Sequence, residues 1–154
     1  MHDTVQSGDQ LRISAPAGKF FFEDQGVDGI VLISGGVGIT PLMSILRYLT
    51  DRVWSRPIYL VNALRTSSDL IYEAELRHLA EQFTNVKMLH FYSQAPSNLP
   101  DQSKSDRWQE QTGYISAQEL DAFVPNIAKL PVLFMRPGCD YACCASIACH
   151  AWRF

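Results

Sequence analysis

The sequence lacks the features that define several large classes of protein. Its most apolar stretch, residues 29–49, is interrupted by glycines, a proline and Arg47, so it does not suit a membrane span. The amino terminus, Met1–Thr4, has neither the basic start nor the apolar run of a secretion signal. The lysines and arginines are scattered, without the basic patch that nucleic-acid binding requires. We therefore expect a cytoplasmic protein whose partners include neither nucleic acid nor membrane.

Cysteine is absent from most of the chain. The four cysteines all lie near the carboxyl end, at Cys139, Cys143, Cys144 and Cys149. A disulfide framework would usually spread them along the fold. Their spacing matches neither paired zinc knuckles nor the plant-type iron–sulfur motif. We predict no metal site, and a metal-binding regulatory role for this tail stays open as an alternative.

What is present suits one folded domain, since the chain has 154 residues, 47% of them apolar and 19% charged. Four apolar runs predict strands that are buried on both faces, as in a parallel sheet. These predicted strands cover residues 29–34, 57–64, 86–92 and 131–134. Helices are predicted between them, and this alternation indicates an α/β fold, a doubly wound parallel sheet with helices on both faces.

Three helices are predicted from apolar spacing and capping residues. The first starts near Pro41, with Thr40 as its cap, and the third follows the capping box of Ser116 and Glu119. The second covers residues 69–83, and its predicted inward residues are Leu70, Ala74, Leu76, Leu79 and Phe83. Residues 8–22 predict a short strand that ends in a turn, and residues 93–112 predict a long polar loop.

The segment from Ser34 to Pro41 joins the first predicted strand to its helix and is rich in glycine. Glycine lets the backbone approach a ligand closely, and a helix start offers N–H groups and a partial positive charge to an anion. No Lys-Ser or Lys-Thr pair follows, so this is not a Walker loop. The pattern predicts a diphosphate site, and a turn that is merely tight is the alternative.

ISGGVGITPLMSIL, residues 33–46, resembles the signature of the ferredoxin-reductase superfamily in its oxygenase-reductase and flavohaemoglobin branches. The last strand of that family's flavin barrel resembles residues 8–22, GDQLRISAPAGKFFF. Later segments of its nucleotide domain resemble residues 62–85, NALRTSSDLIYEAELRHLAEQFTN, and residues 113–120, GYISAQEL. The resemblance covers residues 8–134. It implies a remnant of the barrel at 1–24, an NAD(P)-binding domain at 25–134, and an atypical tail at 135–154.

The resemblance also implies a function. NADH or NADPH would pass a hydride to FAD or FMN, and electrons would continue to an iron–sulfur, haem or carrier-protein acceptor. The residues implied in binding the nicotinamide cofactor are Gly35, Gly36, Val37, Gly38, Ile39, Thr40, Pro41, Asn62, Arg65 and Ser93. Those implied near the flavin are Pro16, Gly18 and Phe20.

Several of these roles have alternatives. Arg65 could instead be a solvated loop residue or a partner of Asp69 or Glu73. We expect no catalytic side chain, because hydride transfer to flavin needs no proton shuttle here. His78 and His90 are therefore interpreted as a helix-surface residue and a strand residue.

Two departures from the family pattern bear on activity. The flavin-anchoring motif Arg-x-Tyr-Ser is absent, so we expect the chain alone to hold no flavin and to show no diaphorase activity. The family's Leu-Cys-Gly-Pro motif after the last predicted strand is replaced by Phe134-Met135-Arg136-Pro137. A nucleotide-binding module without turnover is therefore the alternative function, and the doubly wound sheet is expected to be incomplete at its carboxyl end.

We predict that the tail from Met135 results from a shift of reading frame. Residues 134–142 are encoded by TTY ATG CGN CCN GGN TGY GAY TAY GCN, and reading from the second base permits Leu-Cys-Gly-Pro-Ala-Ala-Thr-Met. That peptide restores the family motif, with the cysteine forced by Met135 and a CGN codon. Sequencing the encoding DNA checks this, and an early stop codon in the shifted frame would show that the tail is native.

Overall fold

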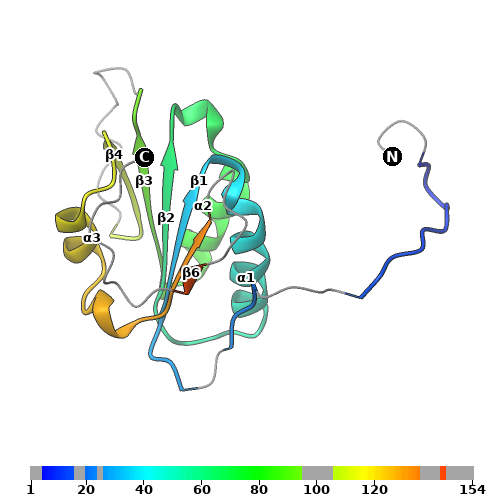
Figure 1. Ribbon diagram of the computed structural model, residues 1–154, viewed down its shortest axis with the longest axis horizontal. Helices are drawn as coiled ribbons and strands as arrows, with labels where there is room; N and C mark the ends of the chain where they lie inside the picture. Colours follow the sequence, from blue (N-terminus) through cyan, green and yellow to red (C-terminus); the bar gives the residue numbers. More distant parts are fainter. Residues whose placement is uncertain (1–4, 16–19, 24–25, 95–105, 136–142, 145–154) are drawn as a thin grey trace.

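The computed structural model describes residues 5–15, 20–23, 26–94, 106–135 and 143–144 (Figure 1). Within them the strands are β1 (Ile30–Gly35), β2 (Ile58–Leu64), β3 (Val86–Tyr92), β4 (Trp108–Thr112), β5 (Val132–Met135) and β6 (Cys143–Cys144). The α-helices are α1 (Ile39–Asp51), α2 (Glu73–Gln82) and α3 (Ala117–Phe123). Short 3-10 turns are η1 (Gly36–Gly38), η2 (Ser67–Asp69) and η3 (Ile127–Lys129).

The strands form one sheet in the order β4-β3-β2-β1-β5-β6. Pairing is parallel from β4 through to β5, and β6 runs antiparallel to β5. Helices α1 and α2 cover one face and α3 covers the other (Figure 1). The predicted α/β doubly wound parallel sheet is confirmed.

Alternation along the strands divides the core into two layers. In β1, Ile30 and Leu32 face α1 and α2, whereas Val31 and Ile33 face α3. All four are at most 2% exposed, which explains why this strand appears in the sequence as a continuous apolar run. Burying each such side chain stabilises the fold by roughly 1.5–3 kcal/mol.

Helix α1 starts earlier than the sequence predicted, and helix α2 starts later. Helix α1 begins at Ile39 with Gly38 as its N-cap, and the hydroxyl of Thr40 donates to the carbonyl of Val37 at 2.9 Å. The prediction of Thr40 as the cap was therefore wrong. Helix α2 begins at Glu73 rather than at residue 69, because Tyr72 has the left-handed φ of 63°.

This interruption changes which residues of α2 face inward. Ala74 was predicted to be buried, but it is exposed, and Ala80 is buried instead. Leu70, Leu76 and Leu79 are buried as predicted, and Phe83 is half-buried against the same core.

Strand β4 lies within the segment that the sequence predicted to be a long loop. It pairs with β3 along Met88↔Trp108 to Tyr92↔Thr112 and forms the edge of the sheet. Trp108 is its one buried residue, and the rest of the strand is polar and partly exposed. An edge strand of this kind has no apolar run, so the sequence pattern that identified the other strands was absent.

The predicted amino-terminal strand of the flavin barrel is not formed in the described residues. Residues 5–15 contain no strand and lie away from the sheet (Figure 1). Leu11 and Ile13 are 58% and 86% exposed. A strand needs a neighbouring backbone to bond to, and no described strand pairs with this segment. Its alternating pattern therefore has no sheet to join in this structure.

Phe20 and Phe22 pack against the core layer under α1, and Phe22 meets Trp54 edge-on at 6.0 Å between ring centroids. Pro16 and Gly18, predicted to lie near the flavin, fall outside the described residues. So does most of the predicted atypical tail, of which Met135 ends β5 and Cys143–Cys144 forms β6.

We predict that Gly29→Ala destabilises the protein. A Cβ at Gly29 would lie 2.9 Å from the carbonyl oxygen of Pro57, which already accepts a hydrogen bond from the amide of Ile30. Backbone cannot move aside cheaply, so we expect a loss of about 1–3 kcal/mol in the free energy of unfolding. Urea unfolding measures this, with Ser44→Ala on the exposed face of α1 as the control. Identical urea midpoints for the Gly29→Ala and Ser44→Ala variants would contradict it.

Candidate functional site

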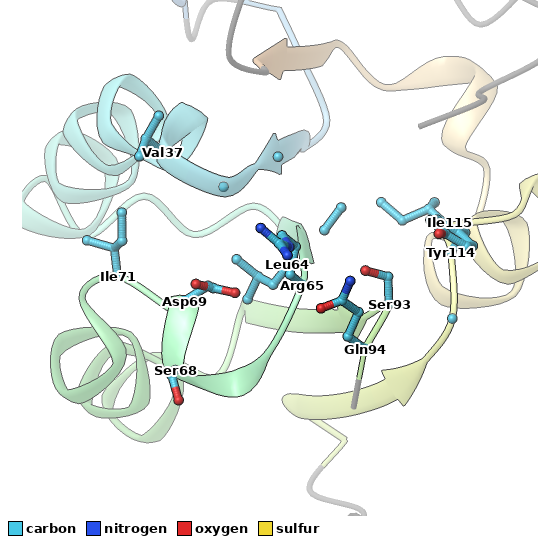
Figure 2. Close-up of a pocket in the computed structure, with 14 residues that line it drawn as sticks. Val37, Leu64, Arg65, Ser68, Asp69, Ile71, Ser93, Gln94, Tyr114 and Ile115 are labelled. Carbon is cyan, nitrogen blue, oxygen red and sulfur yellow. The ribbon is translucent and has the colours of Figure 1, made fainter. Parts of the chain in front are cut away.

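A pocket of about 810 Å³ opens at the carboxyl ends of β1, β2, β3 and β4 (Figure 2). We call it the edge pocket. It is lined by Gly35, Gly36, Val37, Ala63, Leu64, Arg65, Ser68, Asp69, Ile71, Ser93, Gln94, Gly113, Tyr114 and Ile115. Figure 2 shows Val37 and Ile71 toward one end, Ser93 and Gln94 near the middle, and Tyr114 and Ile115 at the other end.

The glycine turn forms one wall of the edge pocket. Gly35 ends β1, and Gly36 has the left-handed φ of 51° that lets the chain turn sharply into η1 and α1. A Cβ at Gly36 would have nothing within 4 Å, so the backbone conformation, rather than crowding, requires glycine there. Val37, which is 61% exposed, is the side chain that this turn adds to the wall.

The turn contributes fewer residues to the edge pocket than predicted. Gly35, Gly36 and Val37 line it, whereas Gly38 and Ile39 are buried behind the turn. Thr40 and Pro41 belong to the first turn of α1 and are not among the lining residues. The first N–H groups of a helix have no partner within the helix, and the positive end of its dipole lies there too. The amide of Ile39 donates to the carbonyls of Gly36 and Val37, and Pro41 has no N–H, so α1 offers an anion at the turn chiefly the positive end of its dipole.

The connection from β2 to α2 forms the facing wall. Arg65 and Asp69 line the edge pocket and are exposed. The carboxylate of Asp69 accepts hydrogen bonds from the hydroxyl and the amide of Thr66, both at 2.9 Å. These bonds, with a smaller contribution from Arg65, lower the pKa of Asp69. Glu73, the other proposed partner of Arg65, is bonded to Arg77 at 2.9 Å.

The ends of β3 and β4 complete the edge pocket. The amides of Ser93 and Gln94 donate to the carbonyls of Leu64 and Arg65 at 3.0 and 2.8 Å, which extends the β2–β3 pairing to the rim. Beyond β4, Gly113 has a φ of 109°, and Tyr114 follows with 66% of its surface exposed.

Arg65 and Ser93, both predicted to bind the cofactor, line the edge pocket. Other lining residues were missed: Ala63, Leu64, Ser68, Asp69, Ile71, Gln94, Gly113, Tyr114 and Ile115. A glycine followed by an exposed aromatic after a strand is the signal that could have found Tyr114. It was not available because β4 itself was not predicted.

Below the edge pocket lies a row of buried polar side chains, Ser34, Asn62 and His90, which we call the polar row. Each is 0% exposed. The hydroxyl of Ser34 donates to Oδ1 of Asn62, and Nδ2 of Asn62 lies 3.0 Å from Nδ1 of His90. Asn62 was predicted to bind the cofactor, but it does not line the edge pocket. Its amide is engaged by its neighbours inside the core.

His90 is held neutral by its surroundings. Burial, with a smaller effect of the positive charge of Arg77, lowers the pKa of His90 to about 3. Trp108 covers the imidazole at 4.3 Å between ring centroids, and the guanidinium of Arg77 lies 4.3 Å from the Trp108 ring centroid. Glu110, which accepts a hydrogen bond from the Trp108 indole at 2.8 Å, adjoins Arg77 at 3.5 Å. The interpretation of His90 as a strand residue is confirmed, and His78 is exposed on α2 as predicted.

The fold and the edge pocket define an α/β nucleotide-binding domain, because ligands of doubly wound sheets bind at the carboxyl ends of the strands. Residues 32–142 match the family model of the oxidoreductase NAD-binding domain. The chain belongs to this family.

Relatives with curated descriptions agree with this assignment. The chain is 34% identical over 141 residues to a flavohemoprotein of Bacillus cereus strain ATCC 10987, covering 88% of this chain and 34% of that protein. It is 28% identical over 137 residues to the glycine betaine monooxygenase reductase subunit of Pseudomonas aeruginosa strain UCBPP-PA14, covering 89% and 36%. The chain therefore spans about a third of the length of these relatives.

Among solved structures, the CS-b5R domains of human Ncb5or in the NAD+ form are similar, with a TM-score of 0.64 and 26% identity. That likeness covers 86% of this chain and 36% of the other. Within the part of the chain that the structure describes, no helix has both the length and the apolarity needed to cross a membrane.

We predict that His90 makes stability depend on pH below its ordinary pKa. Its folded-state pKa of about 3 lies below the ordinary value of 6.5, so at pH values between the two the unfolded chain binds more protons. Stability due to neutral His90 is present above pH 6.5 and is lost as pH falls toward 3, by at most roughly 1.4 kcal/mol per pH unit.

Urea unfolding between about pH 7.5 and about pH 5 measures this effect. The wild type should lose stability more steeply on acidification than His90→Leu, whereas His78→Gln on the exposed face of α2 should keep the wild-type slope. Equal slopes for the wild type and His90→Leu would rule out His90 as the cause.

Proposed function

We propose that this chain binds NADH or NADPH in the edge pocket and presents the nicotinamide to a flavin held by another domain of the same reductase. One observation carries the proposal: the turn Gly35–Val37 lines the pocket at the end of β1 and leads directly into α1. A glycine turn before a helix suits a diphosphate, since backbone approaches it closely and the helix start favours negative charge.

The edge pocket fits a dinucleotide in size and in chemistry. Its volume of about 810 Å³ lies within the range typical of small-molecule sites. The side chain of Arg65 could donate hydrogen bonds to a ribose, and those of Ser93 and Gln94 could both donate and accept them. Tyr114 offers a flat aromatic surface at one end of the pocket. We infer that the glycine turn would hold the diphosphate and that the adenosine would lie toward Arg65, Ser93 and Gln94.

A nicotinamide cofactor, when bound, supplies two electrons as a hydride. The chain's own contribution is to position that group, because the lining residues include no buried acid or base that could act as a proton shuttle. Asp69 is the acidic residue of the lining, and its carboxylate is already bonded to Thr66. The roles proposed for the lining residues are therefore binding and orientation.

The larger protein is also part of the proposal. We propose a flavin barrel that ends within residues 1–24, the NAD(P)-binding domain at 25–134, and an acceptor beyond the flavin that is an iron–sulfur centre, a haem or a carrier protein. The name flavohemoprotein supports a haem as the acceptor, and the name monooxygenase reductase subunit supports a separate oxygenase component as the destination of the electrons. FAD or FMN would be the flavin, Pro16, Gly18 and Phe20 would lie near it, and the cytoplasm would be the compartment.

We predict that the purified chain binds NADH and that Gly36→Val weakens this binding. Valine is strained at the positive φ of Gly36, so the turn must change shape, and we expect affinity to fall about tenfold or more. Titration of NADH fluorescence measures the dissociation constants.

The matched control is Gly26→Val, since Gly26 also has a positive φ of 73° and nothing within 4 Å of its Cβ position. Gly26 precedes β1 and does not line the edge pocket. Its variant should lose stability to a similar degree and keep the wild-type affinity. NADH binding that is the same in wild type and Gly36→Val would remove the turn from the proposed site.

A further inference from the structure

The polar row occupies a single level of the sheet. Ser34 of β1 is the register partner of Asn62 of β2, and Asn62 is the register partner of His90 of β3. Their side chains lie on the face that α1 and α2 cover, where the neighbouring strand residues are apolar. Each successive pair is separated by 28 residues along the chain. Two crossover connections, β1-α1-β2 and β2-α2-β3, thus bring three polar groups into one buried line.

The hydrogen bonds of the polar row run in one direction. Oδ1 of Asn62 accepts from the Ser34 hydroxyl, so Nδ2 of Asn62 is left to donate toward Nδ1 of His90. His90 must accept at Nδ1 and is therefore neutral, with its proton on Nε2. That nitrogen is buried and has no hydrogen-bond partner among the described residues. These hydrogen bonds require the observed strand register, because a slip of one strand by one residue would turn its polar side chain to the opposite face of the sheet.

A row of this kind is not required for stability. Well-packed apolar side chains in the same places would commonly be as stable, whereas an unpaired buried polar group is costly. Buried polar groups that satisfy one another do fix a particular arrangement of the backbone. The position of the polar row in the sheet then indicates which part of the backbone it holds in place.

Each member of the polar row stands just before a segment of the edge pocket. Ser34 is followed by Gly35 and Gly36, Asn62 by Ala63 to Arg65, and His90 shortly by Ser93 and Gln94. The row therefore connects β1, β2 and β3, the three strands that lead into the two facing walls and the third side of the edge pocket. It lies inside the core and cannot touch a ligand itself.

We propose that Ser34, Asn62 and His90 are positioning residues that hold the ends of β1, β2 and β3 in the arrangement that binds a nicotinamide dinucleotide. The inference rests on the proposed function and adds to it residues that do not contact the cofactor. Breaking the row frees the glycine turn to move relative to Arg65 and Ser93. The resulting loss is in affinity, beyond any loss in stability.

The experiment compares two substitutions of His90 in the full chain, at a temperature where all variants are folded. His90→Leu keeps an apolar bulk and removes the acceptor for Asn62, so NADH affinity should fall about tenfold. His90→Asn places an amide oxygen near the position of Nδ1, so it should restore affinity to within about threefold of the wild type, although it leaves a cavity. Stability falls in both variants, but affinity separates them.

Val86→Ala is the matched control, because Val86 lies on the same face of β3, fully buried, at the end away from the edge pocket. It should lower the urea midpoint and leave the NADH dissociation constant unchanged. Ser34→Ala should weaken binding several-fold by itself, and should add little to His90→Leu because the row is already broken. This variant also tests the proposal should His90→Leu fail to fold.

The outcomes separate the two proposals. If the wild type binds NADH and neither His90→Leu nor Ser34→Ala changes its affinity, the positioning role is wrong and the proposed function stands. Equal losses of affinity in His90→Leu, His90→Asn and Val86→Ala would show a general effect of destabilisation and would also overturn the positioning role. If the wild type does not bind NADH or NADPH at all, the proposed function fails and this inference fails with it.

Discussion

The parallel pairing of the five strands β4, β3, β2, β1 and β5 is the constraint on which the rest of the molecule depends. It requires a crossover between strands, and the crossovers place helices on both faces of the sheet, so the central strands are buried on both sides. It also brings every carboxyl end to the same edge. Residues as distant along the chain as Gly35, Arg65, Ser93 and Tyr114 consequently line one pocket. Strand β1, with β2 on one side and β5 on the other, stands where the strand order reverses, which is where doubly wound sheets bind ligands.

The parts of this arrangement that follow from burial could be predicted from the sequence. The runs at 29–34, 57–64 and 86–92 are apolar because both faces of β1, β2 and β3 are covered, and each run identified its strand. The glycine turn was likewise recognisable, since a short connection from a buried strand to a helix requires Gly36 at a positive φ. From the order of elements, the location of the pocket followed before any contact was known.

What the sequence could not predict depended on groups brought together from a distance. The residues of β4 are mostly polar and gave no strand pattern. This strand is at the edge of the sheet, where one side of its backbone has no neighbouring strand. Tyr114 and Gln94 enter the site through that strand and its neighbour, so they were missed with it. Helix α2 begins after Tyr72 because Tyr72 has a left-handed backbone conformation. The spacing of apolar residues carries no information about that conformation. The alternating residues Leu11 and Ile13 show the opposite case, a local pattern without a partner strand.

The polar row shows why a polar residue in an apolar run is ambiguous from sequence alone. Asn62 interrupts PIYLVNAL near the end of its strand, and such a residue either faces a ligand at the edge or meets another buried polar group. The family resemblance implied the first of these. The register decides for the second, because Ser34 and His90 stand on either side of Asn62 at the same level. Leu64, two residues further along β2 on the same face, lines the edge pocket, so in this strand a difference of two residues separates contact with a ligand from support of the residues that make that contact.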